Sequence, residues 1–273
     1  MDKTQIERYL ERIGVQYPAS PSYRFLSRLY TRHLHSVPFE NVDVYCRLPI
    51  FLDERYFYEE VVDHKTGGWC FELNGLFFVL LNELGFDVRM IGGEVYCSGG
   101  TPCYPCSHML IVVTVDRPYL LDVGYGDCFR EPFPLDGNGR LDDGFSIYSL
   151  THNKNTDTYV LSRQDRKDSS TYRILYQFTM KTRTIEEFLP GFGFMVANER
   201  GHLRARFQCN RLGPRGRVTL LNNELKRVTQ NGMTIERIET CDDAISFLKD
   251  EMGFSASKCR RLEDNTKFRK LFA

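Results

Sequence analysis

Cys70 is the side chain in this sequence best placed to act as a nucleophile. It follows the turn residues 67–69 and begins segment 70–84, whose apolar residues recur at helical spacing before Gly85. Unpaired backbone N–H groups and the positive end of the dipole at a helix start favour a thiolate, and the Cys70 N–H could serve as an oxyanion donor. The alternative is a buried cysteine that only packs the helix start, the common fate of a single Cys.

His108 and Asp122 are the candidate base and its orienter, because a thiol attacks best at neutral pH beside a histidine that a carboxylate holds in place. His108 precedes the apolar strand 109–115, and a short turn leads to the strand 119–126, which carries Asp122. This pattern predicts a β-hairpin. Side-chain alternation puts both residues on one face, offset by two to four positions, and only the smaller offset permits a direct bond. Taken singly, each could instead be structural.

Zinc binding is a competing interpretation, because Cys97, Cys103, Cys106 and His108 supply four N or S ligands within a short segment. The segment lacks a second pair of closely spaced ligands and has the composition of a loop between strands, which disfavours it. A CxxC redox role is weaker, since such pairs begin a helix. A cysteine hydrolase or amide synthase with the same triad, and a binding or scaffold protein, are further alternatives.

Three segments together resemble the arylamine N-acetyltransferase family in order and spacing. They are 37–41 (VPFEN), 67–75 (GGWCFELNG), and His108 followed by 122–126 (DVGYG). The resemblance spans about residues 5–255 and weakens after Leu135. It implies an acetyl-CoA-dependent acyltransferase that works without a metal cofactor on an arylamine, arylhydrazine or arylhydroxylamine.

The resemblance also implies roles for individual residues. Cys70, His108 and Asp122 would form a Cys-His-Asp triad. Acetyl-CoA would acylate the cysteine and CoA would leave. The amine would then attack the thioester, which is ping-pong chemistry. The resemblance also implies a role in xenobiotic metabolism.

Aromatic side chains near these motifs are the candidate substrate contacts. Phe39, Trp69 and Tyr125 would form walls of the acceptor pocket, although at least one is expected to be an ordinary core aromatic. The resemblance suggests Gly126 and Phe207 as cofactor-binding residues, the latter only weakly because the segment before it matches the family poorly.

One position near the site departs from the family pattern. The family usually has an arginine directly before the two glycines, where it pairs with the glutamate of the VPFEN-type segment. This chain has Thr66 there, after His64 and Lys65. We therefore expect His64, Lys65 or another cation to contact Glu40.

The surrounding pattern predicts an α+β fold. Helical spacing dominates up to about residue 85, short β-rich runs follow, and the C-terminal part is mixed. With the resemblance, this predicts an N-terminal helical bundle (1–85), a central β-barrel (86–188), a C-terminal α/β lid (189–273) and a papain-like Cys-His-Asp core. The expected strands cover residues 88–96, 109–115, 119–125, 158–161, 171–179, 217–221, 224–228 and 232–238, and a helix is expected at 244–252.

Composition limits the partners. Lys plus Arg and Asp plus Glu both total 36, so no single-sign field is available for a nucleic acid. No signal peptide is apparent and the longest apolar run, 76–81, is too short to cross a membrane. Nine cysteines without regular spacing suggest mostly reduced thiols. We expect a cytoplasmic monomer or weak homodimer whose partners are acetyl-CoA and an aromatic amine or hydrazine.

Overall fold

Helices make up the first third of the chain. The computed structural model describes residues 1–16, 20–96, 100–136, 139–166 and 168–273. Helix α1 starts at Asp2, whose side chain accepts from the Gln5 N–H, and buries the apolar stripe expected of an amphipathic helix. The helices of this part are α1 (Lys3–Ile13), α2 (Tyr23–Ser36), α3 (Val42–Cys46), α4 (Glu54–Tyr58), the π-helical turn η1 (Glu59–Asp63) and α5 (Cys70–Glu83).

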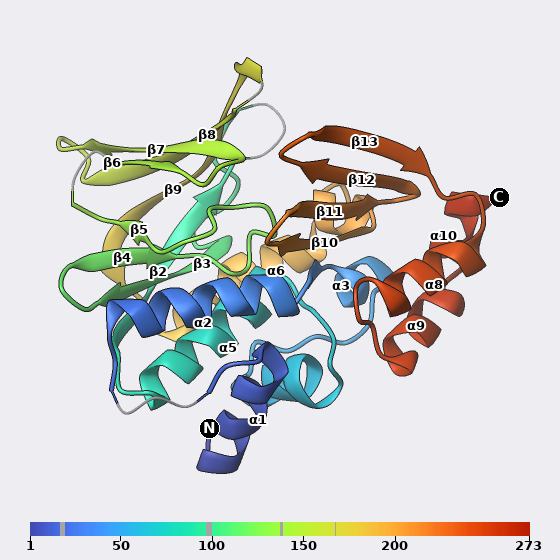
Figure 1. The fold of residues 1–273 in the computed structure, drawn as a ribbon, viewed down its shortest axis with the longest axis horizontal. Coiled ribbons are helices and arrows are strands. Elements are labelled where there is room, and N and C mark those ends of the chain that lie inside the picture. Colours follow the sequence, from blue (N-terminus) through green and yellow to red (C-terminus); the bar gives the residue numbers. More distant parts are fainter. Residues whose placement is uncertain (17–19, 97–99, 137–138, 167) are drawn as a thin grey trace.

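Helix α5 lies at the centre of the molecule. Its first eight residues are all buried, so it lacks the one-sided apolar stripe of a surface helix. It packs against α4 on one side and against strands β2 (Asp87–Val95) and β3 (His108–Thr114) on another. The helix predicted over 70–84 is thereby confirmed, and Figure 1 shows it beside α2 and below β3.

Eight antiparallel strands form a nearly closed, barrel-like sheet. Their order in space is β5-β4-β3-β2-β9-β8-β7-β6. In the hairpin of β3 and β4, Ile111 faces Leu121 and Thr114 faces Pro118. The remaining strands are β4 (Pro118–Leu121), β5 (Phe133–Pro134), β6 (Gly139–Asp142), β7 (Ser146–Asn153), β8 (Thr158–Asp165) and β9 (Asp168–Thr182).

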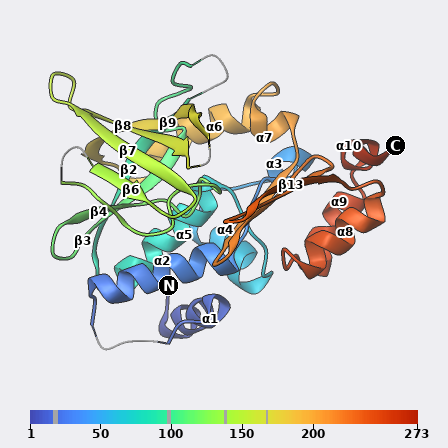
Figure 2. The same ribbon diagram turned by 45° about the horizontal axis from the view of Figure 1, so that its top comes forward.

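A second, five-stranded sheet joins one strand from the N-terminal part of the chain to four strands from the C-terminal part. The short strand β1 (Phe39–Glu40) pairs with β10 (Gln208–Gly213), which continues into β11 (Gly216–Leu221), β12 (Glu224–Thr229) and β13 (Gly232–Arg237). Figure 2 shows α6 and α7 running beside the barrel before this sheet begins. The other late elements are η2 (Ile185–Phe188), α6 (Leu189–Ala197), α7 (His202–Ala205), α8 (Cys241–Asp250), α9 (Ala256–Glu263), α10 (Thr266–Arg269) and η3 (Lys270–Phe272).

The α+β class, with helices first and a barrel-like sheet second, is confirmed. One expected strand is wrong at its end: β4 stops at Leu121, and residues 122–126 form a loop instead of extending the strand to 125. The expected boundaries at 85 and 188 remain predictions. Among the residues described, no helix has both the length and the apolar character needed to span a membrane.

Candidate active site

His108 and Asp122 meet directly. His108 begins β3, Asp122 follows the last residue of β4, and the imidazole Nε2–H donates to the Asp122 Oδ2 at 2.8 Å. Continuing the β3–β4 register by one step puts Asp122 opposite Leu110, which is the smaller of the two offsets expected from the sequence. The two side chains are 2% and 0% exposed, so this charged pair is shielded from water.

Asn74 on α5 fixes the other side of the carboxylate. Its Nδ2 donates to Asp122 Oδ1 at 2.9 Å and to the Met109 carbonyl at 2.7 Å, while its Oδ1 accepts from the Val123 N–H at 2.9 Å. The Gly124 N–H also donates to Asp122 Oδ1 at 3.1 Å. Every polar atom of this buried network therefore has a partner, which restrains the orientation of the carboxylate.

Cys70 is the first residue of α5, and the loop after β4 lies against it. A β-carbon at Gly124 would come within 2.6 Å of the Cys70 Cα and 2.8 Å of Asn74 Nδ2. Only glycine permits this approach, because no side-chain atom fits between the two backbones. The end of the β3–β4 hairpin can thus be held next to the start of the helix.

The electrostatics favour a charged imidazole. Burial by itself lowers the pKa of His108, but the charges of Asp122 and Cys70, together with the hydrogen bond to Asp122, outweigh it and raise the pKa to about 10. The charges of both other side chains therefore act on the imidazole. The rings of Tyr125 and Tyr176 pack around it, with centroids 5.7 and 5.3 Å away.

A cleft of about 560 Å³ lies beside this site. Cys70 and His108 line it, whereas Asp122 does not, and Phe39, Trp69 and Tyr125, the predicted acceptor-pocket residues, line it as well. The side chain of Trp69 is 2% exposed, and its Nε1–H has no hydrogen-bond partner among the described residues. Further lining residues come from the segment after β9 and include Met195, Asn198, Arg200, His202, Leu203 and Arg206.

Neither predicted cofactor-binding residue lines this cleft. Phe207 is fully buried and packs edge-on against Tyr45 and Phe268 in a separate hydrophobic cluster of the C-terminal part. A β-carbon at Gly126 would meet Asn210 and Phe39 within 2.8 Å, so this glycine serves close packing beneath the cleft wall. Local hydrophobicity cannot distinguish a ligand contact from a core residue, so the sequence did not reveal that Phe207, predicted to bind the cofactor, is a core residue.

Glu40 does contact a cation, as expected, but the cation comes from the other end of the chain. Lys258 on α9 places its Nζ 2.8 Å from Glu40 Oε1. His64 lies instead near Glu60, with its Nδ1 3.2 Å from Glu60 Oε1. Of the three alternatives, the structure therefore selects the unspecified cation over His64 and Lys65.

The alternative zinc ligands are not brought together in the part of the chain that the structure describes. Cys103 is disulfide-bonded and His108 is bonded to Asp122. Cys106 is a free buried thiol, and Cys97 lies outside the described residues. No group of three metal-ligating side chains is found in the described ranges, so this structure gives the zinc interpretation no assembled site.

Several residues that shape the site were not predicted from the sequence. Asn74 gives a usable signal: it lies four residues after Cys70 on a largely apolar helix, and hence on the same face. Tyr176, which packs against His108, and the cleft residues of segment 195–206 give none, since their contacts form only when distant parts of the chain come together. Lys258 and Arg261 have the charges of a solvent-exposed helix face, and nothing local distinguishes them.

Comparisons with known proteins agree on one family. A family model described as N-acetyltransferase matches residues 23–258. Arylamine N-acetyltransferase 1 of Mus musculus is 32% identical over 203 residues, which cover 67% of this chain and 69% of the relative. Arylamine N-acetyltransferase 1 of Homo sapiens is 31% identical with the same coverage.

Solved structures show the same fold. The arylamine N-acetyltransferase of Mycobacterium marinum superimposes with a TM-score of 0.88 at 25% identity, covering 98% of this chain and 100% of that one. A structure of the M. marinum enzyme in complex with CoA gives a TM-score of 0.87 at 26% identity, with 97% and 99% covered. The likeness therefore extends over the whole chain, including both sheets and the C-terminal helices.

Proposed function

The chain belongs to the arylamine N-acetyltransferase family and is an acyltransferase that transfers an acetyl group, and from this premise we propose that Cys70 carries the acetyl group as a thioester. His108 is the proposed proton carrier and Asp122 its orienter. The observation that supports this most is the His108 imidazole, which bonds Asp122, interacts with the charge of Cys70 and lines the same cleft as Cys70. The Asp122 bond also holds a positive charge beside the sulfur.

In the first half-reaction, the Cys70 thiolate attacks the acetyl carbonyl of acetyl-CoA. The carbon–sulfur bond to CoA breaks, and the departing CoA sulfur takes the proton of the His108 imidazolium. The Cys70 N–H at the start of α5 is positioned to stabilise the oxyanion formed during attack. Acetyl-Cys70 and a neutral imidazole result.

In the second half-reaction, the amine nitrogen attacks the thioester carbonyl and gives a proton to the now neutral His108. The bond between the acetyl carbon and the sulfur breaks, and Cys70 leaves as a thiolate beside the imidazolium. The starting ion pair is thereby restored without any net proton change in the protein. One cleft serves donor and acceptor in turn.

The proposed acceptors are arylamines, arylhydrazines and arylhydroxylamines, because Phe39, Trp69 and Tyr125 offer flat apolar walls for an aromatic ring. For the donor, three exposed cations at the cleft, Arg173, Arg200 and Arg206, suit the phosphates of CoA better than Gly126 or Phe207. The M. marinum relative that binds CoA supports this choice of donor.

The wider setting is also a proposal. A cytoplasmic location and a role in xenobiotic metabolism follow from the expected substrates, and the active form would be a monomer or weak homodimer. Acetyl-CoA is the only cofactor that this chemistry requires, and it is consumed as a co-substrate.

The test is incubation with acetyl-CoA followed by intact-mass measurement and peptide mapping. We expect a gain of about 42 Da, one acetyl group, on Cys70 and its loss when an aromatic amine is added. Cys106, which is also buried and free, is the internal control and should stay unmodified. Acetylation elsewhere, or an acetyl-enzyme that water but no amine discharges, would contradict the proposal and favour a hydrolase.

A further inference from the structure

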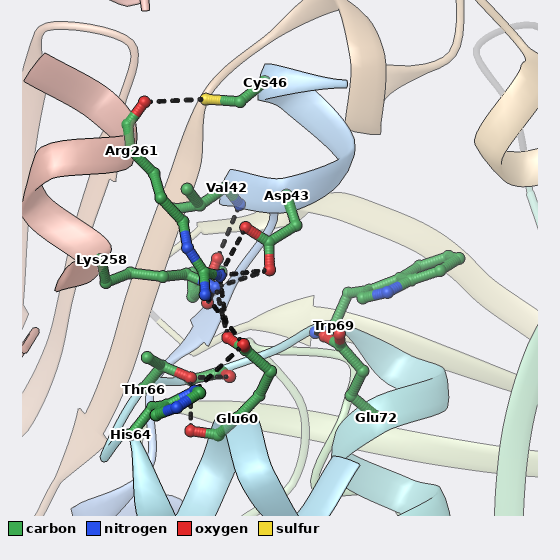
Figure 3. A network of polar contacts seen from close by, with 12 residues as sticks. Val42, Asp43, Cys46, Glu60, His64, Thr66, Trp69, Glu72, Lys258 and Arg261 are labelled. Carbon is green, nitrogen blue, oxygen red and sulfur yellow. Dashed lines mark hydrogen bonds and ion pairs between the residues drawn. The ribbon is translucent and has the colours of Figure 1, made fainter. Parts of the chain in front are cut away.

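A buried ionic cluster lies behind the turn that leads into Cys70. Lys258 and Arg261 project from α9 toward the carboxylates of Asp43 and Glu60 (Figure 3). Lys258 Nζ lies 2.8 Å from Glu40, 3.0 Å from Asp43 and 3.5 Å from Glu60. Arg261 bonds Asp43 and Glu60, each at 2.9 Å. Glu72 is the fourth carboxylate and interacts with Lys258 through its charge.

Lys258 has a position that few lysines occupy. Its side chain is 2% exposed, and that of Glu40 is 1% exposed. Burial lowers the pKa of Lys258, but the charges of Glu40, Asp43 and Glu60 outweigh this and raise the pKa above its ordinary value. The ammonium group therefore stays charged. Removing it would leave the carboxylates buried without their central counter-ion, which is a costly arrangement.

Glu40 connects this cluster to the nucleophile. Its Oε2 accepts from the Val42 N–H at 2.6 Å, while its own backbone N–H donates to the Gly68 carbonyl at 2.9 Å. A β-carbon at Gly67 would lie 2.1 Å from the Pro38 carbonyl oxygen and 2.8 Å from Glu40 Cγ. The backbone of the turn is thus packed directly on Glu40, and Cys70 follows two residues after Gly68.

Glu72 holds the same turn from the helix side. Its Oε2 accepts from the Trp69 N–H at 3.0 Å, and a β-carbon at Gly68 would lie 2.6 Å from that oxygen. Burial raises the pKa of Glu72, and Lys258 opposes the rise. Lys258 therefore acts on both carboxylates that contact the Gly67–Gly68 turn. It contacts Glu40 directly and attracts Glu72 electrostatically.

Position 66, where the family pattern has an arginine, cannot supply this charge here. Thr66 is buried, and its hydroxyl donates to the Glu60 carbonyl at 2.7 Å. The charge comes instead from a helix about two hundred residues later in the chain, since Lys258 and Asp43 are 215 positions apart.

We propose that Lys258 is a positioning residue for acetyl transfer, supplying from α9 the charge that holds Glu40 and the Gly67–Gly68 turn so that Cys70 faces His108. Lys258 does not line the cleft, so it acts through the turn and not on the substrate. The inference rests on the proposed role of Cys70 and gives the C-terminal segment a part in catalysis.

The test measures single-turnover acetylation of Cys70 against acetyl-CoA concentration in the full-length chain. Lys258→Met should lower the maximal rate constant about 10- to 100-fold, because small misplacements of a nucleophile have effects of that order. The acetyl-CoA concentration at half-maximal rate should stay within about twofold, since the cleft is unchanged. Lys258→Arg keeps the charge and should recover most of the rate. Lys249→Met, on the exposed face of α8, is the matched control and should behave as wild type.

Circular dichroism establishes which variants fold, and Lys258→Gln replaces the Met variant if that one does not. A folded neutral variant that acetylates at the wild-type rate would overturn the inference. So would folded Met and Arg variants that are equally slow, because packing and not charge would then be responsible. If wild-type Cys70 itself takes up no acetyl group, the proposed function fails, and this outcome differs from a failure confined to Lys258.

Discussion

The chain buries two polar clusters near the start of α5, and they are built in opposite ways. The Asp122 cluster has one carboxylate, one imidazole and the amide of Asn74, and it opens onto the cleft through Cys70. The Lys258 cluster has four carboxylates around two cations and contributes no side chain to the cleft lining. The first is arranged to move a proton, whereas the second is arranged to keep backbone in place.

The difference shows that one buried charged residue, His108, can transfer a proton, whereas another, Lys258, can hold the backbone in position. His108 can lose its proton because the cleft brings it a sulfur or nitrogen partner. The carboxylates around Lys258 raise its pKa above the ordinary value, so the ammonium group keeps its proton. Changes in the first cluster should therefore affect activity more than stability, and changes in the second should affect both.

Asp122→Asn should have the largest effect. We expect the rate of Cys70 acetylation to fall about 10³- to 10⁴-fold, as when the orienting carboxylate of a triad is neutralised. Without Asp122, burial dominates and the pKa of His108 drops from about 10. The imidazolium of the wild type should persist until the pH rises through about 10, and that of the variant should be lost at lower pH. Mass spectrometry gives the rate, and imidazole NMR signals give the titration.

Asp116→Asn is the matched control, because Asp116 lies in the turn of the same hairpin and its side chain is 61% exposed. It should leave both the rate and the titration unchanged. An Asp122→Asn protein with a near-normal rate would show that the Asp122 cluster does not serve proton transfer.

Glu60→Gln tests the second cluster. Burial raises the pKa of Glu60, but the hydrogen bond from Arg261 and the charge of Lys258 outweigh it and lower the pKa to about 2. A lowered carboxyl pKa adds stability above the unfolded-state value of about 4.5, and this stability disappears as the pH falls through about 2. We expect the substitution to cost about 2 kcal/mol of unfolding free energy at pH 7, measured by urea denaturation.

The cost should shrink as the pH falls from about 4.5 toward 2, because protonation removes the charge from wild-type Glu60 as well. Glu59→Gln, one residue earlier with a side chain that is 43% exposed, is the control and should change stability little. A Glu60→Gln penalty that stays constant over this range would mean that shape, and not charge, makes Glu60 stabilising.

Phe207→Leu should have the smallest effect and concerns a residue that belongs to neither cluster. Because Phe207 fills a closed cluster with Tyr45 and Phe268, we expect a loss of about 1 kcal/mol in unfolding free energy. The acetyl-CoA concentration at half-maximal acetylation should not change, and Phe51→Leu, at an exposed position, should alter neither quantity. A selective rise in that concentration would restore Phe207 as a cofactor contact.

Short-range pattern predicted much of the site. The helix at 70–84 was predictable because an uninterrupted apolar period and a closing glycine lie within one segment. The pairing of His108 with Asp122 was predictable to within two residues because a tight turn fixes the register of a hairpin. The end of β4 was not predictable, because the strand stops where the following loop packs against Cys70.

Weakly patterned elements were missed for a related reason. Strand β7 alternates polar and apolar residues only loosely, and β10 (QCNRLG) contains no long apolar run. Helix α9 (ASKCRRLE) has the composition of a surface helix, although Lys258 within it is buried. Their identities depend on the surfaces that they cover, and local propensity carries little information about those surfaces.

The sequence by itself determined the nucleophile turn, the helix behind it and the hairpin that carries the histidine and carboxylate, because each depends on residues close together along the chain. Only the tertiary structure decided which cation meets Glu40, which aromatics reach the cleft and where Phe207 lies. Charge pairing and burial depend on distance in space, and the chain brings Lys258 and Glu40 together only when its last helices fold back onto its first.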